Sequence, residues 1–200
     1  RRRHSFPTRR SSDLAMKDAC DHNECSLVGG ETSEQPGVIS EETHILGASI
    51  IGVAEKSQII DGSKIAADDL VVAFASNGLH TNGYSLIRKV FTNIDAQLMD
   101  KLLAPHRCYL PVLQKALEHP LAPIKGLVHI TGGGFFENIP RILPKHLGAE
   151  INIKNWQVPP LFQHIQQTGD VPIEQMYRVF NMGIGMIVIT TPEHADLLKS

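Results

Sequence analysis

The chain contains 200 residues, of which 42% are hydrophobic and 20% charged, and its formal net charge is −2. These values are typical of a globular protein with one domain or one and a half, and they exclude a fibrous or wholly disordered chain. Without residues 1–14 the net charge is −6, which argues against nucleic acid as the main partner. No apolar run approaches the roughly 18 residues that a membrane-spanning helix needs, so we expect a cytoplasmic protein without a membrane partner.

The amino-terminal segment 1–14 is rich in arginine and has no apolar periodicity. It is similar to translated sequencing-adapter sequence, and we predict a foreign or disordered leader outside the fold. A nucleic-acid-binding arm is the alternative, because clustered cations bind phosphate backbones. Cys20, Cys25 and Cys108 lack the paired short spacings of a zinc site, so we interpret them as reduced thiols.

The next segment contains a loop, residues 29–37, that combines glycines with two carboxylates, Glu31 and Glu34. Such carboxylates suit Mg²⁺, which takes oxygen ligands and bridges to nucleotide phosphates, but they equally suit a solvated loop. Residues 44–55 are rich in β-branched side chains and predict a strand. A turn within residues 57–63 predicts the linker to a second domain.

The second domain is predicted from residue 64 onward. Its apolar run 70–75 predicts a strand buried on both faces, and a polar, glycine-containing loop with His80 and Asn82 follows. The apolar spacing after this loop predicts a helix, and a loop in this position suits a phosphate or a sugar. The alternatives are that Asn82 caps the helix and that His80 only hydrogen-bonds within the loop.

The stretch 129–141 is the most distinctive part of the sequence. An apolar run over 124–130 predicts a strand, three consecutive glycines predict a tight loop, and the apolar spacing after them predicts a helix. Backbone N–H groups in such a loop hold an anion, most often phosphate, and a turn without ligand is the alternative. The remaining predicted elements are helices over 94–104, 110–118, 160–167 and 173–180 and strands over 149–153 and 187–189.

Four motifs stand in order along the chain, at residues 29–37, 76–86, 129–141 and 180–186. Together they resemble the phosphoribosylformylglycinamidine cyclo-ligases, also called aminoimidazole ribonucleotide synthetases, over roughly residues 18–200. The resemblance implies an enzyme that uses ATP and magnesium to close the imidazole ring of formylglycinamidine ribonucleotide in purine biosynthesis. It also implies a homodimer of two-domain subunits, in which the protein positions its substrates and stabilises charge.

The fold implied is α/β (α+β mixed), with a mixed sheet flanked by helices in a C-terminal domain over residues 64–200. Residues 15–56 are then the remnant of an N-terminal α/β domain for ATP binding and dimerisation. Ser33 and Gln35 replace the Ala and Met that are usual in the family. A large amino-terminal segment and a short carboxy-terminal stretch of the family pattern are absent, so we expect a fragment without cyclo-ligase activity of its own.

The matching positions predict a division of labour. Glu31 and Glu34 bind magnesium on the ATP side, and Glu31 also takes part in catalysis. His80 and Asn82 act where the ring closes, because a histidine titrating near neutrality can take or give the proton that cyclisation moves. The predicted nucleotide-binding residues are Gly29, Gly30, Glu31, Thr32 and Glu34. The predicted substrate-binding residues are Ser76, Asn77, Gly78, His129, Thr131, Gly132, Gly133, Gly134, Asn138 and Arg141.

Two other hypotheses stay open. One is a related ATP-using enzyme of the same architecture, such as formylglycinamidine ribonucleotide synthase, selenophosphate synthetase or thiamine-monophosphate kinase. The sequence of residues 80–84 disfavours all three of these enzymes. The other is a non-catalytic nucleotide-binding module that keeps the loops. Substrate turnover assays separate the enzymes from one another and from the module.

Overall fold

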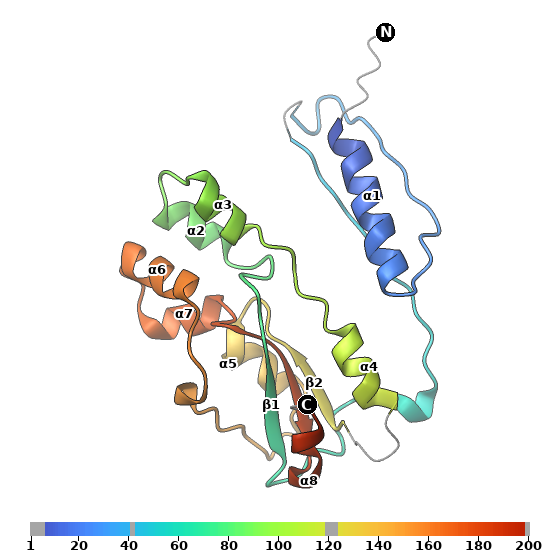
Figure 1. Ribbon diagram of the computed structural model, residues 1–200, viewed down its shortest axis with the longest axis vertical. Helices are drawn as coiled ribbons and strands as arrows, with labels where there is room; N and C mark the ends of the chain where they lie inside the picture. Colours follow the sequence, from blue (N-terminus) through green and yellow to red (C-terminus); the bar gives the residue numbers. More distant parts are fainter. Residues whose placement is uncertain (1–6, 41–42, 119–123, 199–200) are drawn as a thin grey trace. The chain divides into compact units, whose positions relative to one another are not determined.

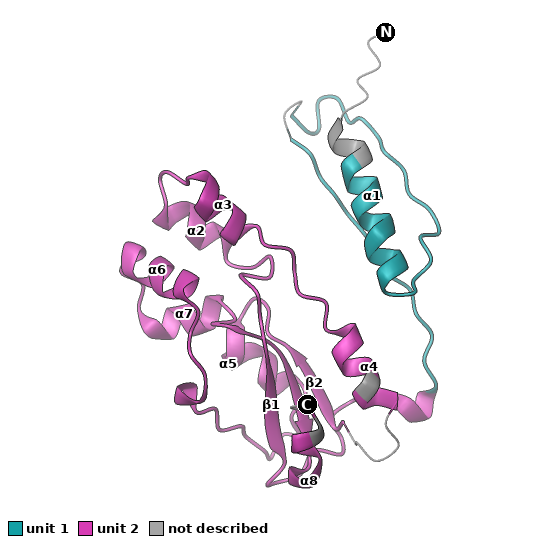
Figure 2. Cartoon of the chain, in the orientation of Figure 1, with its two compact units in different colours: residues 1–55 teal, residues 56–200 magenta. Residues whose placement is uncertain are grey.

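The computed structural model describes residues 7–40, 43–118 and 124–198. The chain divides into two compact units, residues 1–55 and residues 56–200 (Figure 2). No helix among the described residues combines the length and the apolar character needed to cross a bilayer.

Unit 1 contains one helix, α1 (Pro7–His22), in its described part (Figure 1). Leu14, Ala15 and Met16 favour a helix, and Lys17 forms an ion pair with Asp21 one turn later. Residues 7–14 form the first half of this helix, so they are not disordered, and the foreign origin expected for residues 1–14 stays a prediction. The first six residues of that segment lie outside the described part of the chain.

No strand is found in residues 23–40 and 43–55, so the strand predicted over 44–55 is wrong. Its β-branched side chains are open to solvent, with Ile50 83%, Ile51 93% and Val53 102% exposed. A strand needs a partner for its backbone hydrogen bonds, and this unit supplies none in its described residues. Local β-propensity alone was a poor guide here.

Unit 2 is built on a sheet of three strands, β1 (Leu70–Ala75), β2 (Gly126–His129) and β3 (Ile184–Thr190), in the order β1-β3-β2 (Figure 1). Both outer strands pair antiparallel with β3. The mixed α and β content predicted for this domain is confirmed, but the described sheet is antiparallel throughout, where a mixed sheet was expected. The strand predicted over 70–75 is found, but its predicted burial on both faces is wrong, because β1 is an edge strand and Leu70 is 43% exposed; the longest buried apolar run belongs to the central strand β3.

Helices cover the sheet of unit 2. The helices predicted over 94–104, 110–118, 160–167 and 173–180 are confirmed with small changes in their bounds, whereas residues 149–153 form no strand. The α-helices are α2 (Tyr84–Val90), α3 (Ala96–Leu102), α4 (Leu110–Glu118), α5 (Gly134–Asn138), α6 (Pro160–Gly169), α7 (Ile173–Val179) and α8 (Pro192–Ala195). The 3-10 helices are η1 (Lys56–Gln58), η2 (Ile139–Arg141), η3 (Ile153–Asn155) and η4 (Asp196–Leu198).

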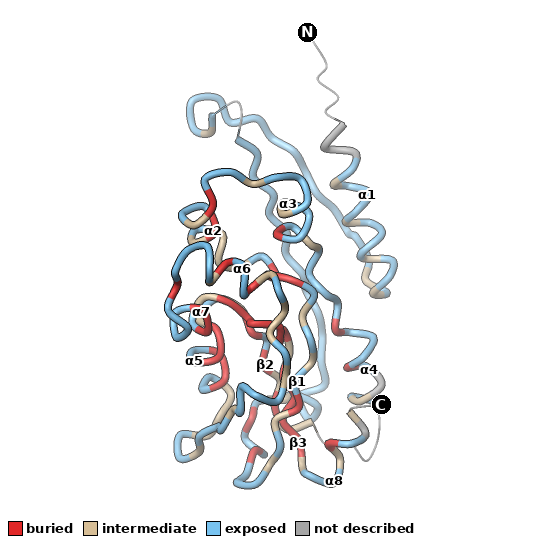
Figure 3. Tube along the Cα trace, turned by 60° about the vertical axis from the view of Figure 1, so that its left-hand side comes forward, coloured by how far each residue is buried: buried red, intermediate tan, exposed pale blue. Residues whose placement is uncertain are grey.

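The main core lies between one face of the sheet and the helices α5, α6 and α7, where Figure 3 shows the buried stretches in red. Ile187 and Ile189 of β3 point into this core, and Val188 between them joins a smaller cluster with Tyr109 and Leu113 on the other face. This alternation is the period of two that a strand imposes. Both faces of β3 are therefore covered, as its apolar sequence requires.

Gly134 marks the closest approach of α5 to α7. Its φ angle is +57°, and a Cβ atom placed on it would lie 1.8 Å from the carbonyl oxygen of Tyr177. The last glycine of the three-glycine loop is thus required by packing and by backbone conformation.

We predict that Gly134→Ala lowers the free energy of unfolding by at least about 2 kcal/mol, because overpacking adds to left-handed strain. Urea unfolding followed by the fluorescence of Trp156, which stacks on Phe135, measures this change. Gly132→Ala is the matched control, because its Cβ would meet only Asn82 Oδ1, at 3.4 Å. Equal stabilities of the two variants would contradict the packing argument.

Candidate functional site

The topology of the sheet brings three polar segments together. Because β1 and β2 each run antiparallel to β3, they run parallel to each other, and their carboxyl ends meet at the edge where β3 begins. The loop after β1, the loop after β2 and the turn before β3 therefore lie at one edge of the sheet. These loops carry three of the four motifs singled out in the sequence.

Asn181 ties the turn before β3 to the loop after β1. Its Oδ1 accepts hydrogen bonds from Ser76 Oγ and from the Gly183 backbone N–H, both at 2.9 Å, and its Nδ2 donates to the Gly78 carbonyl at 2.8 Å. The side chain is buried, so losing these partners would leave unsatisfied polar atoms. Asn181 belongs to the fourth motif, but nothing in its sequence context marks it as a site residue.

The loop between β1 and α2 has an unusual backbone. His80, Thr81 and Gly83 have φ angles of 50°, 60° and 80°, in the left-handed region that is costly for residues other than glycine. Such strain persists where surrounding contacts hold it, and it is common at binding sites. At Gly83 a side chain would also collide with the ring of Phe180, since a Cβ atom would lie 2.2 Å from Phe180 Cε1.

Asn82 joins the His80 loop to the three-glycine loop. Its Oδ1 accepts from Thr131 Oγ1 at 3.2 Å and from the Gly132 N–H at 3.0 Å, while its Nδ2 donates to the His80 carbonyl at 2.7 Å. The alternative that Asn82 caps the next helix is wrong, since Gly83 is the N-cap of α2 and no side chain caps it. Asn82 is a bridge between two loops.

The three-glycine loop is held largely by hydrogen bonds within its own segment. The Gly134 N–H donates to the Thr131 carbonyl at 2.9 Å, and the buried Asn138 donates through Nδ2 to the carbonyls of Thr131, Gly132 and Gly134 at 3.3, 3.2 and 2.7 Å. The Glu137 side chain packs where a Cβ on Gly133 would lie. Phosphate binding by this loop stays a prediction, and an anion would have to compete with the bonds that Gly132 and Gly134 already donate.

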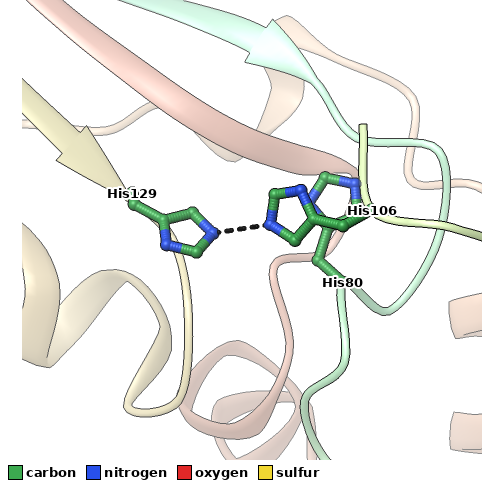
Figure 4. A group of neighbouring side chains, drawn as sticks. All are labelled: His80, His106 and His129. Atoms are coloured by element: carbon green, nitrogen blue, oxygen red, sulfur yellow. Dashed lines mark hydrogen bonds between the residues drawn. The ribbon is translucent and has the colours of Figure 1, made fainter. Parts of the chain in front are cut away.

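Three histidines from three segments form a cluster beside this loop (Figure 4). His80 follows β1, His129 ends β2, and His106 lies in the linker between α3 and α4. The Nε2 atoms of His106 and His129 are 2.9 Å apart, and the ring of His106 stacks on that of His80 with centroids 3.9 Å apart. His106 was missed in the sequence, because it stands in an aperiodic linker outside every motif.

Burial and neighbouring cations set the protonation of the cluster. Burial, together with positive charge on His106, His129 and Arg107, lowers the pKa of His80 to about 4. Partial burial and the proximity of His106 also lower the pKa of His129. At neutral pH these two imidazoles are therefore uncharged and carry a free lone pair.

The cluster packs against β3 at Gly185. A Cβ on Gly185 would lie 2.2 Å from the hydroxyl of Tyr109 and 2.7 Å from Cε1 of His80, so glycine is what lets both rings reach the strand. The Tyr109 hydroxyl donates to the Ala75 carbonyl at 2.9 Å, and burial raises the pKa of Tyr109 to about 12. Tyr109 is thus a neutral phenol that braces the end of β1.

Among the remaining predicted residues, Arg141 belongs to unit 2 and those of the first motif belong to unit 1. Arg141, at the end of η2, lines a separate hollow with Asp61 and His146. Glu31 and Glu34, with Gly29, Gly30 and Thr32, are exposed residues of unit 1. The structure therefore unites Ser76, Asn77, Gly78, His80, Asn82, His129, Thr131, Gly132, Gly134 and Asn138 at one sheet edge.

An antiparallel sheet with helices, carrying amide and imidazole groups on loops at one edge, defines an α/β domain with an enzyme-like site. The family model described as AIR synthase related protein, C-terminal domain, matches residues 66–200. The chain belongs to this family.

Curated relatives are similar over most of the chain. A phosphoribosylformylglycinamidine cyclo-ligase of Chromobacterium violaceum is 45% identical over 187 residues, covering 88% of this chain and 54% of the relative. Those of Neisseria gonorrhoeae and Lactococcus lactis are each 43% identical and cover 96% and 92% of this chain. The chain spans about half the length of these relatives, 58% and 57% for the latter two.

We predict that acid destabilises unit 2 through His80. The unfolded chain binds a proton at its ordinary pKa of 6.5, whereas the folded chain binds it only near 4. Between these values the unfolded state holds more protons, so the free energy of unfolding falls by roughly 2–3 kcal/mol as the pH is lowered through this window. Urea unfolding at pH 7 and pH 4.5 in the presence of EDTA measures the loss.

His80→Gln keeps a polar side chain that cannot titrate, so its unfolding free energy should fall less over the same window. His164→Gln, at an exposed histidine of α6, is the control and should behave as the unmodified chain does. An unchanged pH slope in His80→Gln would show that the proton uptake occurs elsewhere.

Proposed function

We propose that the chain is part of a phosphoribosylformylglycinamidine cyclo-ligase and that the loops at the sheet edge bind its ribonucleotide substrate. One set of contacts supports this most directly: Asn82 joins the His80 loop to Thr131 and Gly132, 49 and 50 residues further along the chain. Two motifs of the family resemblance thereby form one polar surface. The names of the relatives supply the reaction class.

The reaction we propose closes an imidazole ring at the expense of ATP. The γ-phosphoryl group passes to the formyl amide oxygen of formylglycinamidine ribonucleotide, which makes that oxygen a leaving group. An amidine nitrogen then forms the new C–N bond, phosphate leaves with the electrons of the C–O bond, and the nitrogen loses a proton. The protein must therefore position the two reacting groups and accept a proton.

We assign the proton acceptor to the exposed end of the histidine cluster. His129 is exposed, and its lowered pKa leaves it neutral and able to accept a proton at pH 7. His80 is 1% exposed and its Nε2 is 2.7 Å from Asn77 Oδ1, so in this arrangement it acts through its neighbours as a positioning residue. Asn82 holds the Thr131–Gly132 backbone in place for the substrate.

We assign the binding of ATP and Mg²⁺ to residues of unit 1. Glu31 and Glu34 are exposed carboxylates, the donor type that Mg²⁺ prefers, so they fit this ion. When bound, Mg²⁺ neutralises charge on the transferring phosphoryl group. Gly29, Gly30 and Thr32 would lie against the nucleotide. A homodimer and a cytoplasmic location complete the proposal.

Substrate binding by the chain itself tests the assignment of the loops. We predict that Asn82→Ala weakens the binding of formylglycinamidine ribonucleotide, measured by calorimetry, by about 10-fold or more, because Thr131 and Gly132 lose their partner. Asn93→Ala removes an exposed asparagine of the same unit and should leave the affinity unchanged. If the chain binds no ribonucleotide, or if both variants bind equally well, the loops are not the substrate site.

Turnover is tested in a chimera in which residues 56–200 replace the matching segment of the Chromobacterium violaceum relative. We predict ADP release that depends on substrate, and a loss of about 10²-fold in kcat for His129→Gln with the KM for ATP unchanged. His146→Gln is the control. The 200-residue chain alone should show no turnover, and robust activity of that chain would contradict the expectation that it is a fragment.

A further inference from the structure

We infer that His80, His106 and His129 form a binding site for one divalent first-row transition-metal ion, with Zn²⁺ as the best match. Each residue offers a ring nitrogen, and these three atoms lie within 4.8 Å of one another. Imidazole nitrogen suits Zn²⁺, Ni²⁺ and Cu²⁺, whereas Mg²⁺ prefers oxygen. The site therefore differs in its chemistry from the carboxylates Glu31 and Glu34.

The hydrogen bonds of His80 leave one nitrogen free for an ion. Asn77 Nδ2 donates to the Pro105 carbonyl at 2.9 Å, which orients the amide so that Asn77 Oδ1 faces His80 Nε2 at 2.7 Å. The backbone N–H groups of Asn77 and Arg107 also point at Nε2, but from 3.4 Å, so the much shorter contact with Oδ1, which can only accept, assigns the proton of His80 to Nε2. Nδ1 then holds the lone pair, and this buried atom has no hydrogen-bond partner. A buried lone pair without a partner is costly and points to a ligand.

His106 is held in a suitable tautomer as well. Its Nδ1 lies 2.9 Å from the Arg107 carbonyl, to which it must donate, so Nε2 carries the lone pair. Metal-ligating histidines commonly donate their second nitrogen to a carbonyl in this way, which fixes the ring and raises its basicity. His80 with Asn77 and His106 with Arg107 both show this pattern.

Closing the site requires the exposed ring of His106 to rotate. His129 Nε2 is already 2.9 Å from His106 Nε2, and in the metal-free chain it donates to that atom. Two nitrogens bound to one tetrahedral Zn²⁺ at 2.0–2.1 Å lie about 3.3 Å apart. To bind the same ion, the exposed ring of His106 must turn off the face of His80 while it keeps its hydrogen bond to the Arg107 carbonyl, and the proton on His129 Nε2 must move to Nδ1. Three histidines leave a fourth position for water or an oxygen ligand.

Arg107 is the main opposing group, because its positive charge lies close enough to lower the pKa of His80. Its Nη1 donates to the Ala75 carbonyl at 3.2 Å, which directs part of that charge to the backbone. No carboxylate joins the group of three within the described residues. The site is thus a purely imidazole one, which selects soft and borderline ions over Mg²⁺ and Ca²⁺.

Titration of the chain with Co²⁺ and Zn²⁺ tests this site without any reference to turnover. The chain carries no polyhistidine tag, and Cys20, Cys25 and Cys108 are replaced by serine so that thiolates do not bind the ions. We expect one ion per chain at micromolar concentration or below, a visible Co²⁺ absorption band, and paramagnetic broadening of three histidine ring signals. Mg²⁺ at millimolar concentration should not displace the ion.

His106→Ala and His129→Ala should each weaken Zn²⁺ binding by at least about 10-fold, since each removes one ligand. His146→Ala, at another exposed histidine of unit 2, should leave the affinity unchanged. Both test positions are exposed, and equal melting temperatures in EDTA confirm that the variants fold. Absence of binding below about 1 mM, or an equal loss in His146→Ala, would overturn the inference.

Discussion

The pairing of β1 and β2 with the same central strand is the constraint on which the rest of unit 2 depends. Because β3 is antiparallel to both, the two loops that follow the outer strands end at the edge where β3 begins. Side-chain hydrogen bonds of Asn181 and Asn82 then hold those loops together. A slip of one residue in either pairing would turn every side chain to the opposite face and separate these groups.

Glycine is required at these positions of the site for different physical reasons. Gly83 makes room for Phe180, Gly134 for the Tyr177 carbonyl, and Gly185 for the rings of His80 and Tyr109. Gly132 is the member of the three-glycine loop whose Cβ would meet little resistance, and its N–H already donates to Asn82. A glycine-rich motif thus shows that two pieces of backbone approach closely, and only the surrounding donors decide whether an anion binds there.

Local periodicity predicted β1, α4, α6 and α7 well, because each has a clear apolar face or run that packs against neighbours in the same unit. It failed at residues 44–55, where β-branched side chains lie in solvent without a partner strand. It also left the strand order and direction open, since these depend on pairings between distant residues. Asn82 and His80 were found through their motif, whereas His106 joins them only through the path of an aperiodic linker.

The histidine cluster combines buried and exposed imidazoles in a way that favours neutral rings. His80 is desolvated, and positive charge on His106, His129 and Arg107 opposes its protonation, while burial and His106 oppose the protonation of His129. A neutral imidazole has a lone pair that either a proton or a metal ion can take. His129 therefore serves both the proton transfer proposed for ring closure and the proposed ion site, and one ligand excludes the other. A bound Zn²⁺ would block the proton acceptor, while Mg²⁺ on the carboxylates of unit 1 would leave it available.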